Sequence, residues 1–480
     1  MNSVKHHYDN RWLAMALLCM GALMIVLDVT IVNVALPSIR ADLKFDEVTL
    51  AWVVNGYILI FGGFLLLGGR LADLYGHRRI FLAGLALFTL ASLACGMARS
   101  QDFLIVARGV QGLGGAIVDA VSLSLILNLF TGTEERTKAM GVYGFVCSSG
   151  GCIGAVLGGV LTGGFNWHWV FLVNVPVGAI VFALCWKLLP KHAGEARGRR
   201  HLDVGGAVTV TLALLLANYA TINGNQAGWT SPTTLGIFGA ASVVFAVFLV
   251  IESRVEKPLV PLAMFRQRNL AVSSMSGILW SAAMFSWFFL SALYMQLVLG
   301  FTPMQIGMAF LPSNVIMAVM SLGFSAKLVM RFGIKRPLFV GLLFAAAGLL
   351  VFAHAPVDGT LVRDVLPGMI LLGLGAGVAF NPLLMAAMSE VKEADSGLAS
   401  GLVNTAFMLG GALGLAVLAS VAAARTAGLA ADGMDHLGAL TGGYQAAFLC
   451  GGCFALLAAV VGVSLLRVPS GATKAAAATE

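Results

Sequence analysis

The chain has 480 residues, of which 59% are hydrophobic and 11% are charged. Soluble domains carry roughly 25% charged residues. This composition therefore excludes a soluble enzyme and a disordered chain, and it indicates a polytopic membrane protein. The net charge of +7 does not indicate nucleic-acid binding, because the basic residues stand in short loops beside apolar runs. The seven cysteines fall inside apolar runs and imply no disulfide framework.

The apolar runs are about 20 residues long and do not alternate in polarity, which favours membrane helices over a transmembrane β-barrel. Each run can cross a hydrocarbon core of about 30 Å at about 1.5 Å per residue. We therefore expect an all-α protein with fourteen spans. In chain order the predicted spans are 12–36, 50–69, 79–98, 103–127, 139–163, 169–189, 204–222, 234–252, 270–298, 305–329, 338–354, 365–389, 398–422 and 444–467.

Lysine and arginine are distributed unevenly over the connecting loops. If the N-terminus is cytoplasmic and the loops alternate, most of the 29 Lys and Arg residues fall on the inner side. Cytoplasmic loops of membrane proteins carry such an excess. We therefore expect a multi-pass protein of the cell (inner) membrane with both termini in the cytoplasm. The outer side then holds only Arg40, Lys44, Arg99, Arg363 and Arg425.

One loop pattern occurs twice. After the second span, an aromatic residue is followed by Gly76, one further residue and the basic pair Arg78 and Arg79. After the tenth span, the same pattern recurs around Gly333. The alternative explanation is that inner loops resemble one another simply because they are all basic.

The repeat predicts two six-helix bundles with two further helices between them. We place the N-terminal bundle at 1–190, a two-helix insertion with cytoplasmic linkers at 191–268, and the C-terminal bundle at 269–480. Duplicated halves are typical of transporters, in which the substrate site lies near the midplane between the repeats.

Several short motifs are concentrated in residues 27–180. The first span carries Asp28, Asn33 and Pro37, and the loop after the second span carries Gly69, Asp73, Gly76, Arg78 and Arg79. The fourth span carries Arg108, Gln111, Gly112 and Gly114, and the fifth carries Gly150, Gly154, Ala155, Gly158 and Gly159. The entry to the sixth span carries Trp167, Trp169, Asn174 and Pro176. Together they resemble the major facilitator superfamily and, within it, the fourteen-span drug:proton antiporters. The resemblance implies a multidrug efflux transporter that works by alternating access.

Three charged residues lie inside predicted spans and away from the span ends, namely Asp28, Arg108 and Asp119. Such residues cost at least about 2.5–3.5 kcal/mol at the membrane centre, so each indicates a functional site. Asp28 and Arg108 both lie roughly 9–12 Å below the outer surface, at about 1.5 Å per residue, and could be partners directly or through water. Arg108 and Asp119 share a helix face with Gly112 and Gly115. This polar stripe suits a water-filled cavity between the halves.

The carboxylate of Asp28 can carry a proton or neutralise a cation. We hypothesise that it alternates between a proton from outside and a cationic drug from inside. The resemblance implies that Arg108 takes part in proton transfer and that Asp119 is a second site of cation recognition. The alternative for either carboxylate is a structural role, with the acid bonded to a neighbouring helix.

The loop with Gly69, Asp73, Gly76, Arg78 and Arg79 is predicted at the cytoplasmic ends of the second and third spans. The resemblance implies a conformational latch that holds helices together in the outward-facing state. A charge pair present in one state alone would bias a two-state equilibrium. The alternative is ordinary positive-inside charge with an Asp that caps a helix.

Glycines recur in the fifth span as Gly150, Gly154 and Gly158, with Gly159 beside them. Small residues at this spacing let membrane helices approach closely. We expect this antiporter motif to pack against a helix of the second half and to seal one side of the pathway. Tight packing without a gating role is the alternative.

Aromatic residues crowd the ninth span, where we assign Trp280, Trp287 and Tyr294 to substrate binding together with Gln111 of the fourth span. Aromatic faces bind organic cations through cation–π contacts. No Walker A loop is present in the sequence, and the CxxC spacing of Cys450 and Cys453 stands in an apolar helix, where we assign it no role. We therefore expect no cofactor, and the proton gradient as the energy source.

We conclude from the sequence that the protein exports lipophilic, often cationic, small molecules from the cytoplasm in exchange for protons. Its expected partners are these substrates, protons and membrane lipid, with no nucleic acid, and the expected functional unit is a monomer. The main alternative is export of an endogenous metabolite, lipid or peptide on the same fold. A membrane enzyme, a channel and a nutrient importer are further alternatives that the motifs favour less.

Overall fold

The computed structural model describes residues 2–130, 133–189, 203–255, 258, 260–391 and 396–467, and within them every regular element is a helix. The helices up to residue 254 are α1 (Asn2–Leu43), α2 (Glu47–Tyr75), α3 (His77–Gly96), α4 (Gln101–Leu129), α5 (Thr133–Gly164), α6 (Trp169–Leu172), α7 (Asn174–Leu188), α8 (Val204–Ala227) and α9 (Pro232–Arg254). The remaining helices are η1 (Leu262–Arg266), α10 (Arg268–Leu293), η2 (Tyr294–Val298), α11 (Pro303–Val319), η3 (Met320–Phe324), α12 (Ser325–Phe332), α13 (Lys335–Phe352), η4 (Leu361–Val365), α14 (Leu366–Met388), α15 (Ser396–Ala431) and α16 (His436–Leu465).

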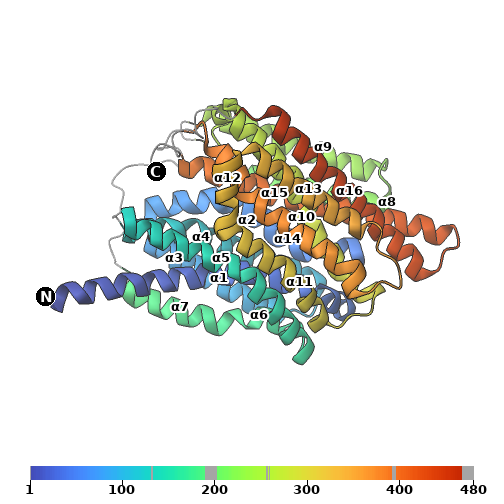
Figure 1. Ribbon diagram of the computed structural model, residues 1–480, viewed down its shortest axis with the longest axis horizontal. Helices are drawn as coiled ribbons and strands as arrows, with labels where there is room; N and C mark the ends of the chain where they lie inside the picture. The colour runs from blue at the N-terminus through green and yellow to red at the C-terminus, as the bar shows by residue number, and fades with distance from the viewer. Residues whose placement is uncertain are drawn as a thin grey trace.

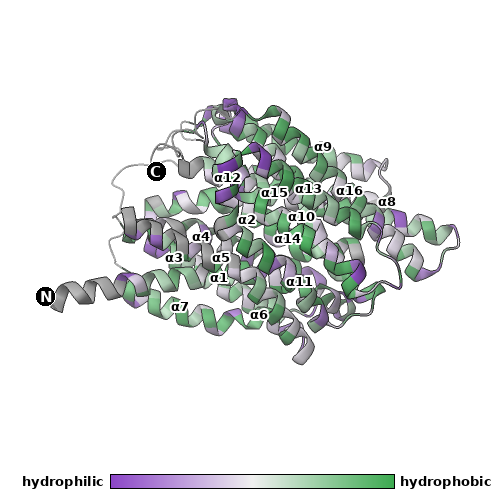
Figure 2. Ribbon diagram, in the orientation of Figure 1, coloured by the Kyte–Doolittle hydropathy of each residue, from purple (hydrophilic) through white to green (hydrophobic). Residues whose placement is uncertain are grey.

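The long helices run roughly side by side, and their apolar residues cover the middle of the bundle while polar residues gather near its two ends (Figures 1 and 2). Within the described residues, twelve helices are long and apolar enough to cross a membrane. Two further apolar stretches are shorter, namely Ser149–Gly164 of α5 and Pro303–Val319 of α11. Each predicted span overlaps one of these helices.

The two repeated loops make the same kind of turn. Gly76 ends α2 at φ 92° and Gly333 ends α12 at φ 75°. In each case the glycine N–H donates to the carbonyl four residues earlier, at 2.9 Å for Gly76 and 2.8 Å for Gly333. Only glycine adopts these conformations without strain, so the recurrence of glycine in the repeat has a backbone cause.

Corresponding helices pack alike in the two parts of the chain. In the first part α1 packs on α5 and α3 packs on α4, and in the second part α10 packs on α15 and α13 packs on α14. Figure 1 shows α1, α6 and α7 in the lower region of the molecule and α13, α15 and α16 in the upper region. The two parts meet where α5 packs on α11 and where α2 packs on α15.

The contact between α5 and α11 is close enough that backbones touch. A Cβ added at Gly307 would lie 2.4 Å from the carbonyl oxygen of Ala155, and one added at Gly159 would lie 3.0 Å from the Cα of Met304. Asn314 Nδ2 also donates to the carbonyl of Gly151 at 3.2 Å. These contacts join the end of α5 to the start of α11, which is the side predicted to face outward.

The glycines spaced four residues apart in α5 pack against a different helix from the one expected. Gly150, Gly154 and Gly158 face α1 of the same half, where added Cβ atoms would meet Val26, Thr30 and Ile31. The expectation that these three glycines pack on the second half is therefore wrong, whereas Gly159 does face α11. Adjacent residues on a helix differ by about 100° in direction, so the row of Gly151, Ala155 and Gly159 points at α11 instead.

Helix α8 lies against both halves, beside the seam between α2 and α15. Asn55 of α2 donates to Asn218 Oδ1 of α8 at 3.4 Å, and Asn218 in turn donates to the carbonyl of Ala412 in α15 at 3.5 Å. Asn55 and Asn218 are fully buried. A Cβ at Gly63 of α2 would collide with Thr211 of α8, so α8 packs tightly here.

Candidate functional site

A buried ion pair joins α1 to α4. Arg108 Nη1 lies 2.5 Å from Asp28 Oδ2, and the two side chains are 1% and 0% exposed. The similar depth predicted for these residues corresponds to a direct contact with no water between them. Two charges excluded from solvent in this way are stable only when they are paired and hydrogen-bonded.

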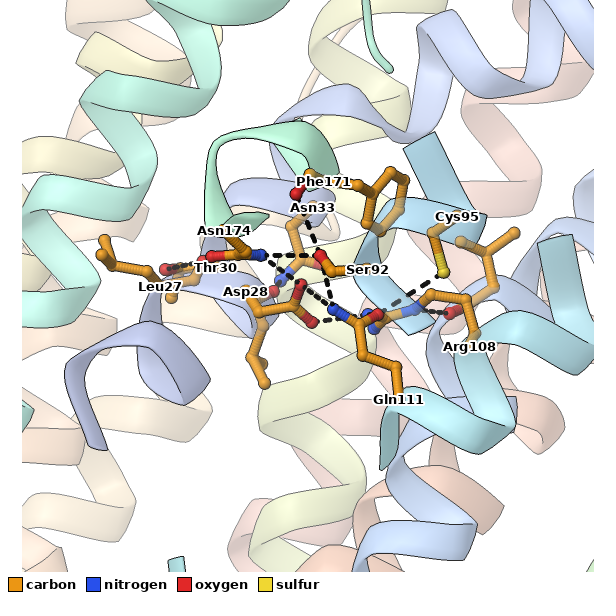
Figure 3. Close-up of polar contacts among 12 residues, drawn as sticks. Leu27, Asp28, Thr30, Asn33, Ser92, Cys95, Arg108, Gln111, Phe171 and Asn174 are labelled. Atoms are coloured by element: carbon orange, nitrogen blue, oxygen red, sulfur yellow. Dashed lines mark hydrogen bonds and ion pairs between the residues drawn. The ribbon is translucent and has the colours of Figure 1, made fainter. Parts of the chain in front are cut away.

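Neutral polar side chains complete the network around Asp28 (Figure 3). Gln111 Nε2 donates to Asp28 Oδ1 at 2.7 Å, and Asn174 Nδ2 of α7 donates to the same oxygen at 3.2 Å. Both amides also donate to the Ser92 hydroxyl of α3 at 3.1 Å. The carboxylate therefore accepts from Arg108, Gln111 and Asn174, which belong to α4 and α7.

The guanidinium of Arg108 is fixed on several sides. Its Nε donates to the carbonyl of Val53 at 2.9 Å, and its Nη1 also donates to Gln111 Oε1 at 2.7 Å. Its Cζ lies 4.3 Å from the ring centroid of Tyr57 and 5.6 Å from that of Phe171. Cation–π contacts of this kind stabilise a desolvated cation.

Glycines of α4 set the distance to α2. A Cβ at Gly112 would lie 2.4 Å from the carbonyl oxygen of Tyr57, and one at Gly115 would lie 2.7 Å from the Tyr57 hydroxyl oxygen. Helix α2 thus covers the α4 surface between Arg108 and Asp119. The expected open polar stripe beside these glycines is wrong, because a neighbouring helix occupies the space that they provide.

Asp119 stands apart from the buried pair. Its side chain is partly exposed, and its Oδ1 accepts a hydrogen bond from the Tyr143 hydroxyl of α5 at 3.4 Å. Asp28 is buried in the same structure. Asp119 is therefore the more accessible of the two membrane-embedded carboxylates.

The loop predicted to form a latch makes contacts within the first half. Arg78 donates from Nη2 to the carbonyl of Trp186 in α7, and its Cζ lies 5.4 Å from the centroid of the Trp186 ring. Arg79 is exposed, and Gly69 lies in α2 with nothing closer than Ala120 to an added Cβ. Asp73 belongs to α2, but its side chain lies outside the described residues.

The aromatic residues assigned to substrate binding are buried inside the second half. Trp280, Trp287 and Tyr294 are each 1% exposed. The Tyr294 hydroxyl donates to the carbonyl of Pro356 at 2.6 Å, so it already has a hydrogen-bond partner within the protein. Neither tryptophan Nε1 has a hydrogen-bond partner among the described residues.

Trp280 belongs to an aromatic cluster that the sequence pattern did not reveal. Its ring centroid lies 5.5 Å from Phe407 of α15 and 6.2 Å from Phe380 of α14. Phe285 lies 6.1 Å from Phe407. Phe380 is the exposed member of the cluster, at 37%.

Sequence reasoning also missed Ser92 and Asn174 as members of the Asp28 network. Both are uncharged, so a search for charged residues inside spans does not select them. Asn174 does belong to one of the motifs quoted above, and a polar amide in an apolar span is a signal that could have identified it.

The family assignment follows from comparison with known proteins. The family model described as Major Facilitator Superfamily matches residues 18–415. The chain therefore belongs to this superfamily of membrane transporters. The fold agrees: the nucleoside transporter NupG superimposes with a TM-score of 0.68 at 13% identity, covering 95% of this chain and 100% of that one. The human organic anion transporter MFSD10 gives 0.62 at 16% identity, with coverages of 94% and 99%.

Similar sequences include several export and resistance proteins. The cephamycin export protein of Amycolatopsis lactamdurans is 35% identical over 88% of this chain and 88% of its own length. The puromycin resistance protein of Streptomyces alboniger is 36% identical over 88% and 84%. The multidrug resistance protein Stp of Mycobacterium tuberculosis is 36% identical over 84% and 74%.

Proposed function

We propose that this transporter is a proton-coupled antiporter that exports lipophilic, often cationic, compounds from the cytoplasm by alternating access. The observation that carries the proposal is the fully buried pair of Asp28 and Arg108, because an acid held inside the membrane is the group a proton-driven carrier needs. The export and resistance proteins similar to this chain support the substrate class. We further propose that the monomer is the working unit.

We propose fourteen crossings, made by the twelve long apolar helices together with α5 and the continuous α11–η3–α12 segment. In this arrangement 1–190 and 269–480 form the two six-helix bundles, 191–268 forms the insertion, and both termini are cytoplasmic. The matching helix pairs α1/α5 with α10/α15 and α3/α4 with α13/α14 support the duplication. Residues 190–202, which include the first boundary, lie outside the described part of the chain.

In the proposed cycle, the described state holds Asp28 paired with Arg108. The carboxylate also accepts from Gln111 and Asn174 and is buried, so water does not reach it while these contacts stay in place. A proton from outside binds Asp28 once the halves move and the contact with Arg108 breaks. Return of the pair expels the proton inward, because the positive guanidinium of Arg108 takes the place of the proton at the carboxylate.

In the proposed cycle, the substrate binds first at Asp119. This carboxylate is partly exposed, whereas Asp28 is enclosed in the described state. We propose that a cationic substrate binds Asp119 from the cytoplasm and that its apolar part reaches Phe380 and the aromatic cluster behind it. Trp280 belongs to that cluster, whereas Trp287, Tyr294 and Gln111 are buried in the described state and reach the substrate when the halves move.

The test uses the purified protein in liposomes with an imposed pH gradient and a cationic dye such as ethidium. We expect gradient-driven dye movement in the wild type and its loss in Asp28→Asn. Asp102→Asn, at an exposed acid in the first turn of α4, is the matched control and keeps full movement. Equal transport by Asp28→Asn and the wild type would contradict the coupling role.

The same assay separates the second candidate, export of an endogenous metabolite. Relatives named for cephamycin export and as a probable actinorhodin transporter motivate it. If no cationic dye moves, but a proton flux follows the addition of a neutral or anionic natural product, the antiporter assignment holds and the substrate class changes.

A further inference from the structure

A cavity of about 300 Å³ lies where α8 and α9 meet α2, α10 and α15. It holds roughly ten groups the size of a water molecule, each taking about 30 Å³. Its walls are apolar side chains and glycine, with Thr405 as the polar exception. None of the described residues that line it is charged.

The cavity has a route to the surrounding bilayer. A second cavity of about 250 Å³ lies between α8 and α9 and shares the side chains of Leu214 and Phe245 with the first. Phe245 is 43% exposed and Leu249, another wall residue, is 37% exposed. These two side chains stand at the outer edge of the bundle. A flexible apolar chain can therefore enter from the lipid side.

Thr405 is the single polar side chain among the described residues that line the cavity. It is 9% exposed and its hydroxyl oxygen is buried in the wall, so the surface that the cavity offers to a ligand is apolar.

Arginines follow the cavity-lining residues at one end of the bundle. Arg70 comes one helical turn after Leu66 on α2, Arg254 ends α9 beyond Leu249, and Arg266 directly follows Phe265. Arg70 Nη2 donates to the carbonyl of Pro258 at 3.3 Å, which ties α2 to the linker before α10. Arg254 and Arg266 are exposed. Arginine is well suited to binding phosphate groups.

We propose that an anionic phospholipid of the leaflet beside these arginines inserts one acyl chain into the cavity. Its phosphate binds at Arg254 and Arg266, and its chain fills the space between the α8–α9 pair and the α2–α15 seam. The site is independent of proton coupling, because it shares no residue with the Asp28 network.

The test is photo-crosslinking of the full-length protein reconstituted with phosphatidylglycerol that carries a diazirine within its acyl chain. We expect adducts on the α15 segment 402–413 and near Gly63 and Leu66 of α2, positions that lipid around the outside of the bundle does not reach. Ala406→Phe, which fills the cavity, abolishes these adducts. Ala246→Phe, at an exposed position of α9 outside the lining, keeps them.

Two further measurements keep the proposal open to refutation. Leu413→Phe fills the cavity from another position and repeats the expected loss if Ala406→Phe fails to fold. Replacing Arg254 and Arg266 by Gln lowers the yield with phosphatidylglycerol and leaves the smaller yield with phosphatidylcholine unchanged. Three outcomes would overturn the proposal. The adducts are confined to exposed residues of α9, they persist in both cavity-filling variants, or the transported dye displaces the lipid.

Discussion

Arg108 Nη1 lies 2.5 Å from Asp28 Oδ2, and neither side chain reaches solvent. The pair joins helices whose contributing residues are 80 positions apart in the chain. We expect stability and transport both to depend on this contact, and the two effects can be measured separately.

Removing one partner of the pair leaves the other charge buried and unpaired. We expect Arg108→Leu to lower the free energy of unfolding by about 3–5 kcal/mol. The double variant with Asp28→Asn recovers most of this loss, since it removes both charges. Thermal unfolding of the purified protein in detergent measures both effects, and Arg79→Leu, at an exposed residue, is the control. An Arg108→Leu protein as stable as the wild type contradicts the buried pairing.

Gln111 bonds to both members of the pair and to Ser92. Gln111→Met keeps the length of the side chain and loses all three contacts, so we expect unfolding to become easier by about 1–3 kcal/mol. Dye export should fall as well, because Arg108 and Asp28 are no longer held in one geometry. Leu113→Met on the same helix is the control and should change neither quantity appreciably. Unchanged export in Gln111→Met would show that the amide does not position the pair.

The backbone contact between α5 and α11 leaves no space for a methyl group at Gly307. We expect Gly307→Ala to push the two helix ends apart and to favour the state in which the predicted outer side is open. Spin labels at Gly164→Cys and Met304→Cys report the distance between these ends. Gly163→Ala, where an added Cβ meets nothing within 4 Å, should leave that distance unchanged. An identical distance in both variants would argue against a gating contact here.

The two repeated glycine turns should respond alike to substitution. We expect Gly76→Ala and Gly333→Ala each to lower the free energy of unfolding by about 1–3 kcal/mol, because both backbones have positive φ. Gly69→Ala inside α2 should have the opposite sign, since alanine is the better helix former. Chemical unfolding of the three variants tests this, and a neutral effect at Gly76 or Gly333 counts against a shared turn.

Much of the helical framework can be predicted from the sequence, because crossing a bilayer requires long apolar runs. The helix ends are less predictable. Predicted spans 398–422 and 444–467 correspond to α15 (Ser396–Ala431) and α16 (His436–Leu465). Hydropathy detects the apolar core of a helix, whereas the alanine-rich end of α15 and the cap by Asp435 extend these helices beyond it.

Of the site, only the charged residues and their depth in the membrane could be predicted from the sequence. Asp28 and Arg108 could be matched because both are ionisable and lie at similar depth in their spans. Asn174 could not be matched, because its distance from Asp28 depends on how α7 packs against α1. The glycine rows of α5 show the same limit, since spacing predicts close packing but does not select the partner helix.

The pair of Asp28 and Arg108 has no net charge while the acid is ionised. A membrane voltage therefore does no work on it when the helices that carry it move. Adding a proton to Asp28 leaves the positive charge of Arg108 uncompensated, and a voltage then acts on that charge with about 2.3 kcal/mol per 100 mV. In the proposed cycle, breaking this contact to bind a proton thus makes the protonated carrier, and not the unprotonated one, sensitive to the electrical part of the driving force.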